Sequence, residues 1–345
     1  VQYTYDERGL LTGATEVQPE VILMDDGYGN VTRTETRRTY TIINGQPKVT
    51  TVTTSTDIEN LDGSHTISNY KGVADFSLRH EGWSPQPGVV QYSYDERGRL
   101  TGATEIYPEV ILMDDGFGNV TRTETGRTYT IINGQPKVTT VATSTEIDNL
   151  DGSQTISRHR GWTFQASLVQ YKYDEKGLLT GVEEVQPEVI LMDDGYGNVT
   201  RTETRRTYSI INGQPKILTV TTGTEIENVD GSQTISSHKG WSSQPGLVQY
   251  TYDEKGRLSG AREIQPEVIL MDDGYGNVTR TETKRAYTTV NGQPKVYTVT
   301  TSTEIDNLDG SHTISSHKSW SCQASVVQYS YDGKGRLTGA REVQA

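Results

Sequence analysis

The chain contains 345 residues, of which 45 are Asp or Glu and 32 are Lys or Arg, so its formal net charge is −13. Only 32% of the residues are apolar, which argues against a thick globular core, and no stretch approaches the roughly 18 apolar residues that a membrane helix needs. The acidic balance argues against a nucleic-acid partner, because phosphates would be repelled, and the single cysteine, Cys322, excludes an internal disulfide framework and a Cys-based zinc site.

A repeat of 79 residues organises the sequence. The tripeptide Val-Gln-Tyr begins at positions 1, 90, 169, 248 and 327, which gives spacings of 89, 79, 79 and 79 residues, and a fixed period of this kind predicts a repeat architecture. Because the chain begins at Val1 without an initiator Met, we expect a processed chain or a fragment. The predicted repeats are 1–89, with ten extra residues near 70–81, then 90–168, 169–247, 248–326 and a partial fifth repeat at 327–345.

The first predicted element of each repeat is a hairpin. In the second repeat, Val90, Tyr92 and Tyr94 alternate with polar residues, and a similar alternation resumes at Leu100 after an Asp-Glu-Arg-Gly turn. A period of two is typical of half-buried strands. We expect the tyrosines to lie opposite the small Gly102 on the paired strand, where an aromatic ring would cover the glycine backbone.

Three further turns follow in each repeat, so that one repeat is expected to hold about four hairpins. In the second repeat they are 114–119 (Asp-Asp-Gly-Phe-Gly-Asn), Asn133-Gly134, whose residues suit a type I′ turn, and 148–153 (Asp-Asn-Leu-Asp-Gly-Ser). Pro136 must lie at a strand start or edge, because it cannot donate to a ladder. In the first repeat the predicted turn residues are Asp6, Gly9, Gly27, Gly29, Asn30, Asn44, Gly45, Asp62 and Gly63.

The hairpins predict an all-β fold. A single hairpin cannot bury its apolar face and would be only marginally stable, whereas stacked hairpins share a thin core and satisfy one another's backbone groups. We therefore predict tandem β-hairpin repeats that stack into an elongated solenoid-like or spiral β rod. The side chains predicted to pack the repeats together are Tyr3, Tyr5, Trp83, Trp162, Trp241 and Trp320.

A family resemblance rests on the first turn. The segment 94–101, Tyr-Asp-Glu-Arg-Gly-Arg-Leu-Thr, resembles the tyrosine–aspartate (YD) repeat of the rearrangement-hotspot (Rhs) family, as do 252–258 and 331–337. The first and third repeats keep Tyr-Asp and Gly but carry Leu10 and Leu178 in place of the arginine. The motif is short, and the match covers somewhat under half of each repeat.

The resemblance implies large secreted or surface-exposed proteins, mostly bacterial, whose β-hairpins wind into a spiral strip. In toxin members of the family this strip closes into a hollow shell around a C-terminal effector. The chain departs from that pattern in its regular 79-residue period and in lacking a visible effector or protease-like terminal segment.

Acidic residues at two of the turns are the candidate metal or catalytic groups. Asp25 and Asp26 could act as acid and base or bind calcium, but Asp and Gly also suit turns by hydrogen-bonding their own backbone, and we prefer that interpretation. Asp148 and Asp151 resemble part of a calcium loop, but the spacing is wrong and no Glu stands at the twelfth position. We therefore expect no metal and no other cofactor, with calcium at these turns as the alternative.

Threonines and histidines also recur with the repeat. The run 120–125, Val-Thr-Arg-Thr-Glu-Thr, places threonines on one face of a strand, which suits either an ice- or glycan-binding plane or, as we prefer, a solvated β face with weak cross-strand charge pairs. His159, His238 and His317 follow the period, but no partner carboxylate or Cys stands at a fixed spacing, so we expect them to be surface or packing residues. Without a Gly-x-Ser-x-Gly nucleophile context, and with near-copies of every site, an enzyme is the least favoured class.

These features predict a structural protein, namely a fibre- or filament-forming segment of a secreted or cell-surface β-repeat protein whose repeats join edge to edge. The expected partner is the chain itself, either as a head-to-tail homopolymer in which the partial fifth repeat accepts residues 1–20 of the next copy, or as the continuation of one long chain. One alternative is a multivalent adhesin stalk that binds a surface glycan, and another is part of a toxin-encapsulating shell.

Overall fold

The computed structural model describes residues 1–25, 31–60, 64–68, 83–290, 292–313, 323–333 and 335–344, together with the strands at 316–317 and 320–321. The described residues form antiparallel strands and turns without a helix, so the all-β prediction is confirmed. It follows that no helix of the described chain could span a membrane. Six expectations lie outside the described residues, namely those for Asp26, Gly27, Gly29, Asn30, Asp62 and Gly63, as does the insertion near 70–81.

The chain divides into two compact units. Unit 1 comprises Val1–Thr155 and Ala166–Thr180, and unit 2 comprises Ile156–Gln165 and Gly181–Ala345. The strands of unit 1 are β1 (Gln2–Tyr5), β2 (Leu11–Thr15), β3 (Glu20–Asp25), β4 (Val31–Ile43), β5 (Gln46–Glu59), β6 (His65–Ile67), β7 (Gly88–Tyr94), β8 (Leu100–Tyr107), β9 (Glu109–Asp114), β10 (Val120–Ile132), β11 (Gln135–Asp148), β12 (Gln154–Thr155) and β15 (Ser167–Tyr173). The strand β16 (Leu179–Gln186) crosses the boundary in the sequence.

The strands of unit 2 repeat the same order. They are β13 (Arg158–His159), β14 (Trp162–Thr163), β17 (Glu188–Asp193), β18 (Val199–Ile211), β19 (Gln214–Glu227), β20 (Gln233–Ile235), β21 (Ser237–His238), β22 (Trp241–Ser242), β23 (Gly246–Tyr252), β24 (Leu258–Gln265), β25 (Glu267–Asp272), β26 (Val278–Val290), β27 (Gln293–Asp306), β28 (Ser316–His317), β29 (Trp320–Ser321), β30 (Ser325–Tyr331) and β31 (Leu337–Gln344).

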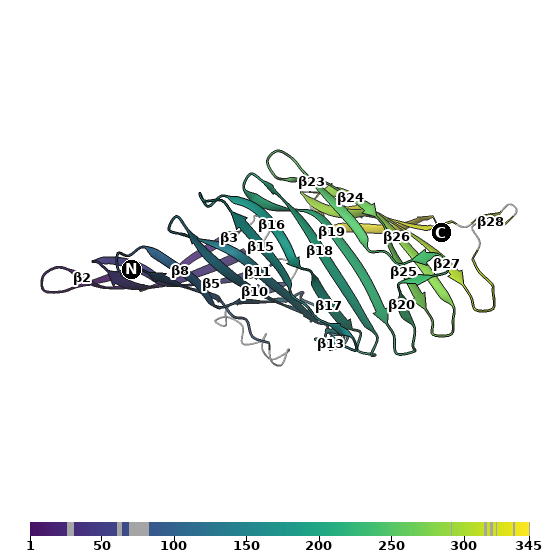
Figure 1. The fold of residues 1–345 in the computed structure, drawn as a ribbon, viewed down its shortest axis with the longest axis horizontal. Helices are drawn as coiled ribbons and strands as arrows, with labels where there is room; N and C mark the ends of the chain where they lie inside the picture. Colours follow the sequence, from purple (N-terminus) through teal and green to yellow (C-terminus); the bar gives the residue numbers. More distant parts are fainter. Residues whose placement is uncertain are drawn as a thin grey trace. The chain divides into compact units, whose positions relative to one another are not determined.

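A long hairpin dominates each repeat, as β18–β19 and β26–β27 show in unit 2 (Figure 1). In unit 1, β10 and β11 pair along their whole length around Asn133 and Gly134, whose φ angles are 52° and 73°. Positive φ at both central residues matches the right-handed twist of the strands. The ladder shifts register between Thr128 and Tyr129, which marks a bulge.

The expected pairing of tyrosines with Gly102 is wrong. Gly102 lies opposite Ser93, because the β7–β8 ladder shifts register between Ser93 and Tyr94, and Tyr94 then pairs with Leu100. A Cβ atom added to Gly102 would lie 2.5 Å from Ser93 Oγ, so the serine hydroxyl would have to move aside. The glycine therefore accommodates a neighbouring hydroxyl rather than an aromatic ring.

Among the described residues the core is divided into three small clusters, one at each boundary between the first four repeats. In unit 1, Val110, Leu112 and Val120 pack with Ile67. In unit 2, one cluster holds Val189, Leu191 and Val199, and the next holds Val268, Leu270 and Val278. Apolar burial is the main favourable contribution to folding, so a chain with few apolar residues concentrates it at these points.

Candidate functional site: the interface between repeats

A backbone ladder joins each long hairpin to the next repeat. The outer edge of β5, from Thr51 to Thr54, pairs with β7, and within each unit the same antiparallel ladder recurs between β11 and β15, β19 and β23, and β27 and β30. Strand addition of this kind satisfies edge N–H and C=O groups that would otherwise be exposed. The interface between repeats is thus one more strand pairing of a continuing sheet.

Polar side chains continue this contact beyond one end of the ladder, on the side of the Asn-Gly turn. In unit 2, the Tyr252 hydroxyl donates to the Ile217 carbonyl at 2.7 Å, and the Asn212 side chain donates to the Glu254 carbonyl at 2.9 Å. The same tyrosine contact is made by Tyr94, Tyr173 and Tyr331. Tyr3 and Tyr5, which were predicted to pack repeats together, are exposed.

Tryptophans cover the apolar clusters of the following repeat. Trp83 packs against the cluster around Leu112, Trp162 against that around Leu191, and Trp241 against that around Leu270. Each cluster also receives an isoleucine from the preceding repeat, Ile67, Ile156 or Ile235. The side chain of Trp320 lies outside the described residues.

Two of the periodic histidines, His159 and His238, have carboxylate partners, so the expectation that no partner stands at a fixed spacing is wrong for them. His159 Nε2 lies 3.1 Å from Glu227 Oε2, and His238 Nε2 lies 2.7 Å from Asp306 Oδ2, each across 68 residues of sequence. The imidazoles also lie 5.8 and 5.9 Å from the rings of the neighbouring tryptophans. The histidine beside each of these tryptophans therefore contacts a carboxylate at the end of the long hairpin in the next repeat.

The charge at Asp306 depends on these contacts. Lys239 Nζ lies 2.8 Å from Asp306 Oδ2. The hydrogen bond from Lys239, and then that from His238, lowers the pKa of the Asp306 carboxyl below its ordinary value of 3.8. The ionised carboxylate is thus the form that the interface favours.

Acidification is expected to weaken this contact. A carboxyl whose pKa is lowered by folding contributes stability above its ordinary pKa and loses it as the pH falls through the lowered value. The difference in urea midpoint between the native chain and Asp306→Asn should therefore be largest at neutral pH and shrink in acid. A difference that stays constant with pH would contradict this role for the carboxylate.

The carboxylates of acidic turn residues accept hydrogen bonds from backbone N–H groups of the same turn. Asp115 Oδ1 accepts hydrogen bonds from the backbone N–H groups of Phe117 and Asn119, and Asp151 Oδ1 accepts from Ser153. Asp25 and Asp148, two of the calcium candidates, also make interactions within the chain. Among the described residues, no group of three His, Cys, Asp or Glu side chains is arranged to hold a metal ion.

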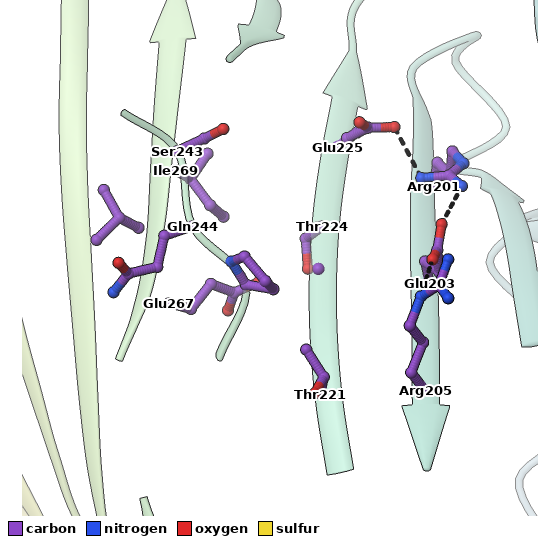
Figure 2. Close-up of a pocket in the computed structure, with 13 residues that line it drawn as sticks. Arg201, Glu203, Arg205, Thr221, Thr224, Glu225, Ser243, Gln244, Glu267 and Ile269 are labelled. Carbon is purple, nitrogen blue, oxygen red and sulfur yellow. Dashed lines mark hydrogen bonds and ion pairs between the residues drawn. The ribbon is translucent and has the colours of Figure 1, made fainter. Parts of the chain in front are cut away.

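A groove of about 290 Å³, lined by both polar and apolar side chains, lies in unit 2 between the β18–β19 hairpin and the start of β25 (Figure 2). On β18, Arg201 bridges Glu203 and Glu225, at 2.5 and 2.9 Å, and Arg205 contacts Glu203 at 2.7 Å. Although burial opposes it, the bonds from Arg201 and Arg205 hold the pKa of Glu203 below its usual value. The charged side chains on the β18–β19 side of the groove are thus paired with one another in ion pairs.

Sequence reasoning missed several residues of the interface. Gln165 forms a backbone bridge to Val189 of β17, and Gln244 forms the same bridge to Val268 of β25. The side chains of the two glutamines donate hydrogen bonds to the carbonyls of Pro187 and Pro266. The only sequence signal for these glutamines is their recurrence with the 79-residue period.

Comparisons with known proteins find little likeness. No protein-family model and no curated protein matches the chain. Two solved structures, that of TcdB2-TccC3 and that of TcdB2-TccC3 without its hypervariable C-terminal region, are 10% and 9% identical over 99% and 97% of this chain, with TM-scores of 0.11 and 0.08. The chain spans about a quarter of each, 27% and 26%. A likeness at such TM-scores carries no argument about fold or function.

Proposed function

We propose that the chain is a structural segment that forms a rod or filament by joining near-identical β repeats edge to edge, in a secreted or cell-surface protein. The recurrence of one interface supports this function. The same ladder, tyrosine contact and tryptophan cover join consecutive repeats wherever both sides are described within one unit. Identical contacts repeated along a chain add repeats at a constant step, which favours an elongated solenoid-like or spiral arrangement.

Electron microscopy of the purified chain tests this proposal. We expect rods whose mean length grows with protein concentration, because a head-to-tail contact between copies produces open assemblies rather than closed ones. Sedimentation velocity at the same concentrations gives an independent measure of the same growth. Compact particles of uniform size at every concentration would overturn the proposed function.

A multivalent adhesin is the second candidate, and the groove in unit 2 is the observation that favours it. Arginine, glutamate, threonine and glutamine side chains line it, and their many donors and acceptors suit a neutral, hydroxyl-rich ligand such as a glycan. A glycan array probed with the native chain and with Arg201→Ala tests this function. Loss of binding in the variant supports the groove as the site, whereas no binding by the native chain, or binding that survives the replacement, removes this candidate.

A further inference from the structure

In unit 2, the turns at one end of the long hairpins expose large apolar side chains. Tyr196 lies between β17 and β18, and Tyr275 lies between β25 and β26, whereas Val229 and Leu308 lie in the turns that follow β19 and β27. All four residues are between 70% and 83% exposed. The same positions of unit 1 are also exposed, at Phe117 and Leu150. Because the exposure recurs from repeat to repeat, it is a property of the repeated fold.

The two turns of each repeat are joined to one another. The backbone N–H of Val229 donates to Asn198 Oδ1 at 3.0 Å, and that of Leu308 donates to Asn277 Oδ1 at the same distance. A Cβ atom added to Gly276 would lie 3.3 Å from the side chain of Leu308, so the leucine lies against the tyrosine turn. We call each such pair of turns a tip pair. The tip pairs of unit 2 are 194–198 with 228–232, and 273–277 with 307–311.

The backbone that carries each tyrosine is held by hydrogen bonds within its turn. Asp194 Oδ1 accepts from the backbone N–H groups of Tyr196 and Asn198, and the Asn198 side chain donates to Asp194 Oδ2 at 2.6 Å. The glycines on either side of the tyrosine, Gly195 and Gly197, have φ angles of 79° and 89°, which few other residues adopt. A partner that binds the ring therefore does not have to order this turn, which lowers the cost of binding.

The two tip pairs of unit 2 abut. A Cβ atom added to Gly274 would lie 3.3 Å from the carbonyl oxygen of Gly231, so the second turn of one pair lies against the first turn of the next. Figure 1 shows the loops side by side at the lower ends of the long strands of unit 2. Contiguous exposed apolar residues of this kind mark interaction surfaces. We call these four residues the turn row, namely Tyr196, Val229, Tyr275 and Leu308.

Negative charge surrounds the turn row. The two tip pairs, together with the strand ends at Asp193 and Asp272, contain six aspartates and no Lys or Arg. The backbone N–H groups of Gly195 and Gly274 donate to Oδ1 of these two aspartates, and among the described residues no hydrogen bond reaches their Oδ2 atoms. The row thus presents carboxylate oxygens next to exposed apolar side chains.

The cations that contact this end of the long hairpins are paired with other carboxylates. Arg160 contacts Glu227, and Lys239 contacts Asp306. In the part of the chain that the structure describes, none of the six aspartates of the row forms an ion pair with a Lys, Arg or His. A partner that neutralises these aspartates must therefore bring its own cations.

We propose that the turn row of unit 2 is a docking surface for a basic segment of another protein, rich in arginine and carrying leucine-like apolar side chains. A guanidinium stacks on a tyrosine ring and binds carboxylate oxygens with two hydrogen bonds, so arginine fits both components of the row. Its apolar stem also covers exposed aliphatic surface while the charged group stays in contact with water or a carboxylate. This inference goes beyond the proposed filament, because the turn row lies outside the ladder that joins the repeats.

Charge complementarity selects this occupant over the others. A second copy of the chain carries a net charge of −13, and an anionic lipid surface or a nucleic acid is also negative, so each would be repelled by the aspartates. A neutral glycan could stack on the tyrosines but would leave the six charges without a counterpart. Only a cationic partner gains from both the apolar and the charged parts of the row.

Fluorescence anisotropy on the full chain tests the surface. The probe is a labelled peptide of repeated Arg-Arg-Leu, and the matched peptides are repeats of Arg-Arg-Ser and of Glu-Glu-Leu. We expect saturable binding of the first peptide, weakened about tenfold or more by the double variant Tyr196→Ser with Tyr275→Ser. Asp230→Asn with Asp309→Asn should weaken it several-fold. The control is Glu254→Gln, which removes an exposed charge from the turn after β23 and should leave binding unchanged.

The outcomes separate a built surface from general attraction to an acidic chain. Binding that survives the tyrosine variant, or that Arg-Arg-Ser reproduces in full, overturns the proposal, because the peptide would then respond to net charge alone. Failure of Arg-Arg-Leu to bind the native chain overturns it as well. If the native chain instead binds neutral phosphatidylcholine vesicles through the tyrosines and not the peptide, the surface serves a membrane and the basic partner is rejected. Rods in electron microscopy of the tyrosine variant are expected to be unchanged, so failure of the filament proposal is read separately.

Discussion

Replacing Leu191 with alanine is expected to lower the free energy of unfolding by about 3 kcal/mol, within the range of roughly 2–5 kcal/mol for buried leucines. Leu191 is fully buried in a cluster of three residues covered by Ile156 and Trp162, so the cavity would have few neighbours able to fill it. The same replacement at Leu23, which has the same sequence context but is exposed, should cost less than about 0.5 kcal/mol. The chain thus supplies its own matched control.

Urea unfolding followed by tryptophan fluorescence measures both variants. Repeat arrays need not unfold in one step, so hydrogen exchange of the β17–β19 amides should accompany the global curve. Protection in these strands is expected to fall in Leu191→Ala and to stay unchanged in Leu23→Ala. Equal losses in the two variants would show that the small clusters are not what stabilises the repeats.

The local elements of the fold could be predicted from the sequence because they depend on neighbouring residues. The alternation around Tyr92 predicts strands, and Asn133-Gly134 predicts a tight turn whose residues need positive φ. The preference for turn chemistry at the acidic loops follows in the same way, since an aspartate bonds the backbone two to four residues ahead. At Asp115 and Asp151 the structure places the carboxylates in those bonds.

The contacts between repeats could not be predicted because they depend on register. A one-residue shift in β7 places Gly102 opposite Ser93 instead of a tyrosine. The His159–Glu227 pair spans 68 residues, a separation that shows no local pattern in the sequence. The repeat period identifies which residues recur, but only the strand pairing determines which of them meet.

Each repeat also buries charged residues that the sequence pattern does not mark. In unit 2, the backbone N–H of Arg285 donates to Glu263 Oε2 at 2.6 Å, and its guanidinium lies 3.4 Å from Glu267 Oε2. The Glu263 side chain is only 8% exposed. Burial raises the pKa of Glu263, although the hydrogen bond and the charge of Arg285 oppose the shift. Equivalent clusters surround Arg38, Arg127 and Arg206.

Replacing Arg285 with an uncharged residue should therefore destabilise the folded chain. We expect Arg285→Met to lower the free energy of unfolding by about 3 kcal/mol, the lower end of the range for a broken buried ion pair, because Arg285 itself is 32% exposed. Two carboxylates would then stay buried without a positive partner, whereas the methionine keeps most of the apolar stem. The double variant Arg285→Met with Glu263→Gln should recover part of the loss, since an amide can still accept the backbone hydrogen bond without a charge.

The pH dependence distinguishes a charge effect from lost packing. A carboxyl whose pKa is raised by folding destabilises the native state above that pKa, and the penalty is relieved as the pH falls through it and the group binds a proton. The stability difference between the native chain and Arg285→Met, measured by urea unfolding, should thus be largest at neutral pH and narrow in acid. The double variant should show a weaker pH dependence. If the difference is the same at every pH, the arginine acts through the packing of its stem, and the buried carboxylates do not need its charge.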